Sequence, residues 1–547
     1  MENLKKYLFN FLFFSFLFFF IYNLSVIYSE YYSDFHHWGF IASTSLDYIN
    51  GRLLFKEVLV HYGAGQLIFF DLINNFYKIN FTSIGIVTSI IYYLNLLLLY
   101  FIIKKISNLY FAFIFISAIF FVHPFITYPW PDYMAGLCLT LFFYFTLFNS
   151  KLFLLSGFFL FLSVLFRSTY IVGIFFSIIT YLFFIKFNKK LYNNCLVKIL
   201  LTFLSFLFIY LFYLFFNNNL SEWFSQSIGA IKNYAEVSQD PAFGFSDRLS
   251  DKVASFVYNN LGSLFFTFFQ LCKFIIKFVI NILFPKTIED FIFFIFYIIN
   301  FFFICLFIVK KKYKQFFAFN ETNNGILLFF SFLGFFGVIQ SLYAFNFFRN
   351  FNASSSVFFL SAYFFKNFLI KNSLKKIKIY IFFVIFFLFL LLINFFNVSK
   401  SMFKINKSAF QSSSIQYFGN RKFAKEDLQY YSSLNYILCK DNKKIFNFTQ
   451  DFNLTYLCND KDFFHFIFIM MLSKKNSLVM KDFLAGRFEK NTIYISTLGP
   501  NFKNFRTNNI IIPPKSIAYF IERSPNFIER SHSVVMQRPS KLYIYKN

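Results

Sequence analysis

The feature that most constrains this chain is a series of long runs with almost no charged residue, such as 11–28, 84–103 and 380–398. Each run holds about 18 residues or more, the length that a helix needs to cross the hydrocarbon core of a bilayer. The chain is 58% hydrophobic and only 14% charged, more apolar surface than a soluble fold can keep from water. The runs therefore predict a polytopic α-helical membrane protein.

Lysine clusters set the expected orientation. Lys5 and Lys6 precede the first run, which favours a cytoplasmic N-terminus because basic residues flank the cytoplasmic ends of spans. The run 258–284 carries Lys273 and Lys277 at helical spacing, so we interpret it as an interfacial helix. With about 11 transmembrane helices, every lysine cluster at a span end falls on the cytoplasmic side and the C-terminus lies outside. The expected spans are 7–28, 81–103, 108–123, 133–149, 152–166, 169–185, 197–216, 288–309, 325–345, 355–370 and 379–398.

The character of the chain changes after the last span. We expect residues 1–398 to form the transmembrane domain and 399–547 a soluble extracytoplasmic domain of α/β or α+β type, on the periplasmic side of the cytoplasmic (inner) membrane. Cys439 and Cys458 can pair if this tail faces an oxidising compartment. Alternating runs predict strands at 444–449, 492–496, 509–512 and 541–545, and two further segments, 464–472 and 518–523, are candidate helices.

The formal charge of +27 is compatible with nucleic acid, but the lysines and arginines gather at span ends, where membrane lipid with anionic head groups is the expected partner. We therefore expect no nucleic acid. No Walker loop, G-x-G-x-x-G or H-E-x-x-H pattern occurs. With short cytoplasmic segments, ATP-driven transport and cytosolic nucleotide-sugar chemistry have no place in the chain.

The loop 30–66 that follows the first span is the densest group of titratable residues, with three of the six histidines. Asp34 is expected just beyond the bilayer edge, where a carboxylate screened from water can act as a general base. The alternative is that Ser33 or Asp34 caps a helix that runs to Ile49 and is ended by Asn50 and Gly51. The two roles are compatible.

The topology sends several further polar side chains to the same membrane face as Asp34. The histidines are candidate ligands of a metal or phosphate, or they anchor the loop. Asp132 is either a binding residue or a helix cap. The arginines either bind phosphate or extend to the lipid head groups. The expected substrate-binding residues are His36, His37, Glu57, His61, Tyr62, Asp132, Arg167 and Arg349.

The order of features in this loop is an acid after the first span, a short helix, a Gly-containing turn at 50–52 and the stretch 54–63. It resembles the first loop of the GT-C class of membrane glycosyltransferases, which includes protein mannosyltransferases and the lipid A aminoarabinose transferase. The resemblance implies a polyprenyl-phosphate-linked sugar donor, a glycan, lipid or protein acceptor, and Asp34 as the catalytic base. The chain departs from the class at two places. Asp34 is followed by Phe35 and His36, so the D-x-D pair is missing, and Phe55 stands where the class often has Pro-Tyr. No cofactor is certain: metal ligands stay unassigned, with a divalent metal (Mg or Mn) as an open option.

Two other classes of protein compete with the glycosyltransferase. A transporter or flippase for lipid-linked saccharide or polysaccharide needs polar residues along a path through the bilayer, and the expected spans carry few. A non-catalytic scaffold would act through its soluble tail alone.

Overall fold

The structure is a computed structural model, and its described residues fall into two compact units. The helical unit comprises 1–28, 85–213 and 273–405, and the loop unit comprises 29–84, 214–272 and 406–547. The described residues are 2–32, 37–58, 60, 62–224, 226, 276, 280, 287–309, 321–341, 347–370, 388–389, 391–400, 402–440, 444–447, 454, 456–458, 463–465, 490–496, 517–522 and 541–546.

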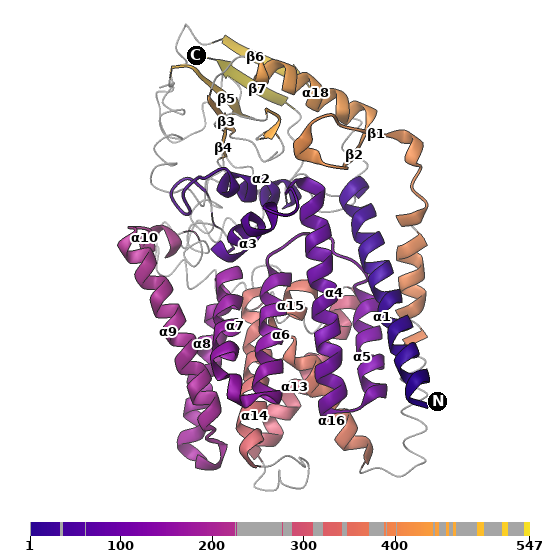
Figure 1. Cartoon of the computed structure of the whole chain (residues 1–547), viewed down its shortest axis with the longest axis vertical. Helices are drawn as coiled ribbons and strands as arrows, with labels where there is room; N and C mark the ends of the chain where they lie inside the picture. Colours follow the sequence, from indigo (N-terminus) through magenta and orange to yellow (C-terminus); the bar gives the residue numbers. More distant parts are fainter. Residues whose placement is uncertain are drawn as a thin grey trace. The chain divides into compact units, whose positions relative to one another are not determined.

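The helical unit is a bundle of apolar helices whose long members run roughly along one direction (Figure 1). The core is largely aromatic; the rings of Phe143 and Phe330, for example, meet edge to face with centroids 4.7 Å apart. Its helices are α1 (Glu2–Ile27), α4 (Phe81–Ile106), α5 (Leu109–Val122), α6 (Asp132–Phe148), α7 (Phe153–Phe166), α8 (Tyr170–Phe187), α9 (Asn194–Phe216), α13 (Ile288–Val309), α14 (Glu321–Phe336), α15 (Phe347–Ala353) and α16 (Ser356–Ile370).

Among the described residues, five helical segments are long and apolar enough to cross a membrane. This confirms the expectation of a helical membrane protein in its coarse form, while the count of about 11 spans stays a prediction. The segments are Tyr7–Tyr32, Phe81–Ile106, Tyr170–Phe187, Asn194–Phe216 and Ile288–Cys305, and shorter apolar helices cover Leu109–Val122, Asp132–Phe148, Phe153–Phe166 and Asn324–Ile339.

One expected span contains a change of helix type. In the run 325–345, helix α14 ends at Phe336 and a 3₁₀ turn follows at Gly337–Ser341, while 342–345 lie outside the described residues. A Cβ on Gly337 would lie 2.3 Å from the carbonyl oxygen of Ala353, so only glycine lets the two backbones approach here. Nearly all of the interfacial helix expected at 258–284 and half of the span expected at 379–398 lie outside the described residues.

In the loop unit, the first loop forms two helices, α2 (His37–Ile49) and α3 (Ala64–Asn74). The expected end of the first helix is confirmed. Gly51 has φ +84°, the Arg52 N–H donates to the Asp47 carbonyl (3.1 Å), and the Gly51 N–H donates to the Tyr48 carbonyl (2.9 Å). This pattern is a Schellman motif, which needs a left-handed residue just past the helix end.

The tail forms a helix, α18 (Lys425–Cys439), and two sheets. In the larger sheet the strand order is β4-β3-β5-β7-β6, with β3 parallel to β4 and β5, and β7 antiparallel to β5 and β6. The cysteines Cys439 and Cys458 form a disulfide. The strands are β1 (Phe410–Ser412), β2 (Lys422–Ala424), β3 (Lys444–Asn447), β4 (Phe463–His465), β5 (Thr492–Ser496), β6 (Ile517–Glu522) and β7 (Lys541–Lys546).

Three of the predicted strands are found, at β3, β5 and β7, and the candidate helix 518–523 is wrong. This segment is strand β6, paired with β7 from Ile517 opposite Lys546 to Glu522 opposite Lys541. Six residues are too few for a stable isolated helix, and pairing with a distant strand overrides local preference. The candidate helix 464–472 begins in β4, and its remainder and the expected strand 509–512 lie outside the described residues. A separate domain outside the membrane stays a prediction.

Candidate functional site

Three predicted site residues come together inside the helical unit: Asp132, Arg167 and Arg349. They are 0%, 5% and 9% exposed. Asp132 is the first residue of α6, Arg167 follows the last residue of α7, and Arg349 lies in α15. The three are far apart in the sequence, so the packing of three helices against one another creates the group, which we call the buried charge cluster.

The acid of the cluster pairs with one arginine. The Arg167 Nε lies 3.5 Å from the Asp132 Oδ1, and the Asp132 Oδ2 has no hydrogen-bond partner among the described residues. Pro131 is the cap residue of α6, and the Asp132 side chain makes no capping hydrogen bond. Its position in the first turn still stabilises the carboxylate, since the N-terminal end of a helix is positive.

The second arginine is held by aromatic rings. The Arg349 guanidinium lies 5.3 Å from the centroid of the Trp130 ring and 5.8 Å from that of Phe348, within the range of a cation–π interaction. Both Arg167 and Arg349 are buried by protein, which favours the ligand-binding interpretation over side chains that extend to lipid head groups.

A tyrosine that the sequence reasoning did not select completes the cluster. The charges of Asp132, Arg167 and Arg349 all act on Tyr170, near the start of α8. Its hydroxyl has no hydrogen-bond partner among the described residues, and neither do the two amide atoms of Asn350, which is fully buried beside Arg349 in the sequence. Buried polar atoms of this kind normally bind water or a ligand.

A small cavity of about 10 Å³ borders the cluster, lined by Thr169, Tyr170, Gly173, Gly337 and Ala353 among others. This is room for about one water molecule. A ligand larger than water does not fit this cavity without movement of the residues that line it.

Two polar networks adjoin the cluster. In the first, the His123 Nε2 lies 2.7 Å from the Tyr133 hydroxyl, and the Tyr92 hydroxyl donates to the His123 carbonyl at 2.6 Å. Tyr133 follows Asp132 directly in α6, so this network reaches the cluster along the chain. His123 is buried.

The second network joins α4, α6 and α15. The Thr140 hydroxyl donates to the Asn95 Oδ1 (2.7 Å), the Asn95 Nδ2 donates to the Asn352 Oδ1 (3.2 Å), and the Asn352 Nδ2 donates to the Phe348 carbonyl (2.7 Å). A Cβ on Gly136 would lie 2.3 Å from the Asn352 Oδ1, so glycine makes room for this side chain. The network fixes α15, the helix that carries Arg349.

The other predicted binding residues belong to the loop unit and do not form a cluster among themselves in the described part of the chain. His37 is the first residue of α2 and is half-buried. The Glu57 Oε2 accepts a hydrogen bond from the Leu53 N–H (3.0 Å), and the Tyr62 ring meets the Phe40 ring at 5.7 Å. Asp34, His36 and His61 lie outside the described residues.

The loop between α2 and α3 is held in an unusual backbone conformation. Phe55 has φ +65° and is buried, in a region that bulky side chains rarely adopt. The Gln226 side chain donates to the Phe55 carbonyl (2.8 Å) and accepts from the Val60 N–H (2.9 Å). Strain of this kind persists where surrounding contacts determine the conformation, and it is enriched at functional sites.

No group of three or more His, Cys, Asp or Glu side chains that can hold a metal occurs within the residues that the structure describes. The charge cluster itself offers one carboxylate and two arginines, a set suited to an anion rather than to a cation. Compared with models of known protein families and with curated proteins, the chain has no match.

Several residues with the strongest contacts were missed by sequence reasoning. Tyr170 carries no signal in a chain with 36 tyrosines. Asp47 offers one in retrospect: it lies in the last turn of α2, where the helix dipole disfavours an acid, so it needs donors from elsewhere. Glu289 is a second acid near the networks; it acts electrostatically on Tyr92 and Tyr133.

Proposed function

We propose that the chain is a membrane glycosyltransferase that transfers a sugar from a polyprenyl-phosphate donor to a glycan, lipid or protein acceptor on the outer face of the cytoplasmic membrane. The observation that carries the proposal is the buried charge cluster of Asp132, Arg167 and Arg349 inside a bundle of apolar helices. Ionisable side chains are costly in such a bundle and are usually kept for a substrate or an ion.

The chemistry of the cluster suits the phosphate of a lipid donor. Arginine presents a planar fork of N–H donors that matches two phosphate oxygens at once, and it stays charged when buried. Tyr170 and Asn350 add unsatisfied polar atoms next to the same charges. The isoprenoid chain of the donor would remain in lipid or between helices, while its phosphate lies in the cluster.

The reaction that follows is a single displacement. Asp34 takes the proton of the acceptor hydroxyl as that oxygen attacks the anomeric carbon, and the bond from this carbon to the phosphate oxygen breaks. The phosphate leaves with the bonding electrons and is stabilised by Arg167 or Arg349. Attack opposite the leaving group inverts the configuration, as expected for a single-step transfer with one base.

The disulfide supports the proposed orientation. Cys439 and Cys458 are bonded in the tail, and disulfides form and persist in oxidising compartments rather than in the cytosol. This is the side of the membrane on which the lysine clusters place the C-terminus. The proposal therefore has the first loop and the tail outside and the N-terminus in the cytoplasm.

A transfer assay tests the proposal. Membranes that contain the protein are incubated with radiolabelled polyprenyl-phosphate sugars, with and without a chelator. The variant Asp34→Asn is measured beside a matched control, Asp71→Asn, a half-buried acid on α3 of the same loop unit. We expect transfer by the parent and the control and none by Asp34→Asn at equal expression. Transfer retained in Asp34→Asn refutes its role as the base, and loss with the chelator identifies a metal requirement.

A transporter or flippase for lipid-linked saccharides is the second candidate, and one observation favours it. The network of Asn95, Thr140 and Asn352 places more buried polar atoms between helices than the sequence led us to expect. A transporter would move labelled donor across a vesicle membrane without breaking the bond between sugar and phosphate. Product analysis in the same assay separates the two functions, because only a transferase releases free polyprenyl phosphate.

A further inference from the structure

The tail of the chain holds helix α2 at both of its ends. Near the start, the Tyr417 hydroxyl donates to the Gly39 carbonyl at 3.5 Å, and near the end, the Tyr456 hydroxyl donates to the Asp47 Oδ1. All four residues belong to the loop unit. Asp34 lies three residues before His37, the first residue of α2, in the sequence.

The contact of Tyr456 with the end of α2 lies in a buried polar group of side chains. Asp47 is fully buried, and its Oδ1 also forms an ion pair with the Arg52 Nη1 at 2.9 Å. The Schellman turn at Gly51 brings Arg52 back over the helix end. A carboxylate without donors would be strongly unfavourable here, because it is buried and lies at the negative end of the helix. Tyr456 and Arg52 therefore act together on the same oxygen.

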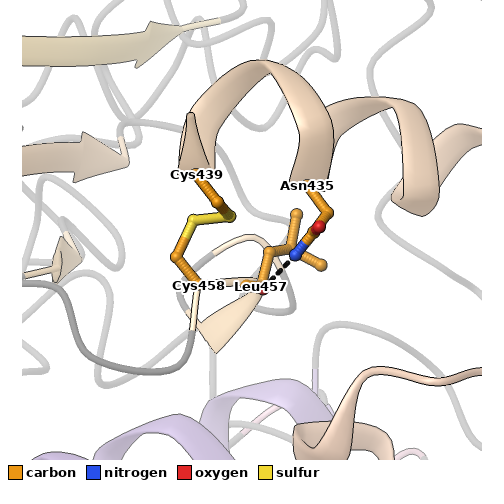
Figure 2. Close-up of a disulfide and its surroundings, with 4 residues drawn as sticks. All are labelled: Asn435, Cys439, Leu457 and Cys458. Atoms are coloured by element: carbon orange, nitrogen blue, oxygen red, sulfur yellow. Dashed lines mark hydrogen bonds between the residues drawn. A yellow bond between two sulfur atoms is a disulfide. The ribbon is translucent and has the colours of Figure 1, made fainter. Parts of the chain in front are cut away.

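Three contacts hold Tyr456 and the two residues that follow it. Its ring stacks on the Tyr417 ring with centroids 5.5 Å apart and planes 22° apart. Two residues further on, the disulfide joins Cys458 to Cys439 at the end of α18, and the Asn435 amide donates to the Leu457 carbonyl (Figure 2). Reduction of the disulfide removes the covalent contact and leaves the others.

A second set of contacts fixes the start of α4 to the same tail. The Arg421 guanidinium lies 4.9 Å from the centroid of the Phe81 ring, and the Asn420 N–H donates to the Thr82 hydroxyl at 3.1 Å. Phe81 in turn stacks on Trp38 in the first turn of α2, with centroids 5.9 Å apart. The tail thus contacts α2 directly and through Phe81.

We propose that Tyr456 and Asp47 are positioning residues of a redox-sensitive clamp, in which the tail fixes α2 and the Cys439–Cys458 disulfide keeps Tyr456 in place. Through the clamp, the tail sets the position of α2, which begins three residues after Asp34 in the chain. The catalytic consequence rests on the proposed function, in which Asp34 is the base. The clamp itself does not rest on it.

Hydrogen–deuterium exchange of the full-length protein in nanodiscs tests the clamp without any substrate. The Tyr456→Phe variant loses only the hydroxyl, and a hydrogen bond to a carboxylate is strong enough for an expected 10- to 100-fold faster amide exchange in the last turns of α2. Tyr436→Phe, an exposed tyrosine on α18, is the matched control and should leave the exchange unchanged.

Three comparisons make the test decisive. The double variant Asp47→Ala/Tyr456→Phe should exchange about as fast as Asp47→Ala alone, because each single variant already removes the hydrogen bond between the two side chains. Treatment with a dithiol, which reduces the disulfide to two thiols, should speed exchange in α2 of the parent and not of Cys439→Ser/Cys458→Ser. Parent-like exchange in Tyr456→Phe, or independent single effects, overturns the clamp.

Kinetics of sugar transfer separate this inference from the proposed function. With an active parent, we expect Tyr456→Phe to lower kcat about tenfold with little change in the KM for donor, and Asp47→Asn, which keeps an acceptor oxygen, to be milder. A looser α2 with an unchanged kcat refutes the positioning role. A parent without transferase activity refutes the proposed function, and the exchange data then decide the clamp by themselves.

Discussion

Replacing Arg167 with methionine tests the buried charge cluster most sharply. The change keeps an unbranched side chain out to the position of the Arg167 Nε and removes the charged guanidinium, so that Asp132, which is fully buried with its Oδ1 3.5 Å from that Nε, loses its ion-pair partner. Removing one partner of a buried ion pair typically costs about 3–5 kcal/mol, because the remaining charge stays desolvated. Both side chains are less than one-tenth exposed, so solvent screening does not reduce this range.

An internal thiol measures the effect. Cys138 is buried on α6, the helix that begins with Asp132, so a maleimide reaches it only when the bundle opens. When reclosing is faster than labelling, the labelling rate follows the population of the open form. With the other unpaired cysteines replaced by serine, we expect labelling about 100- to 3,000-fold faster in Arg167→Met, since each 1.4 kcal/mol is a factor of ten.

The control is the double variant Arg167→Met/Asp132→Asn, which removes both charges. Neutralising a buried pair is often close to neutral for stability, so most of the parent's protection of Cys138 should return. A single variant that labels within threefold of the parent, or a double variant no better than the single, would refute the view that Asp132 depends on Arg167.

Three further predictions follow from the geometry. In Gly51→Ala the new Cβ has open space and only the φ of +84° is unfavourable, so the free energy of unfolding should fall by about 1–2 kcal/mol. In Gly419→Ala, φ is +57° and a side-chain oxygen lies 2.4 Å from the new Cβ, so the loss should be larger in the same melting experiment. Thr140→Val should lower the stability of the bundle by about 1–3 kcal/mol, because the Asn95 amide oxygen loses the hydroxyl that donates to it at 2.7 Å. The rate of Cys138 labelling measures this loss. The isosteric control is Thr202→Val, since the Thr202 hydroxyl donates only within its own helix. Burial, with the Asp47 carboxylate, raises the pKa of Tyr456 well above 10, so its contribution to stability is present below about pH 10 and is lost as the pH rises toward the folded-state pKa. In an ultraviolet titration, Tyr456→Phe should show one late-titrating tyrosine fewer than the parent.

Patterns that act locally were readable from the sequence. Apolar runs marked the helices α4 to α9 within a few residues, and period-two alternation marked β5 at its observed bounds, Thr492–Ser496. Asn50 and Gly51 indicated the end of α2, because helices commonly end with a glycine or asparagine in the left-handed conformation, which Gly51 adopts. Strand β6 was missed since its pairing with β7, not its own pattern, makes it a strand.

The site was readable only in part. Asp132, Arg167 and Arg349 stood out as charges at the ends of apolar runs, and the structure brings them together. Tyr170 could not be selected, because an ordinary tyrosine becomes notable only when packing places charges around it. Asp47 and Tyr456 are 409 residues apart, and no spacing rule joins side chains at that separation.

Retention of the lipid donor tests the central claim most directly. The purified protein in nanodiscs is equilibrated with a radiolabelled polyprenyl-phosphate sugar, and the bound label is compared between the parent, Arg349→Gln and a surface control, Lys189→Gln. If the buried charge cluster binds the phosphate, the parent and the control retain the donor, and Arg349→Gln binds it at least tenfold more weakly. Equal retention by all three proteins, or none by the parent, would contradict the account.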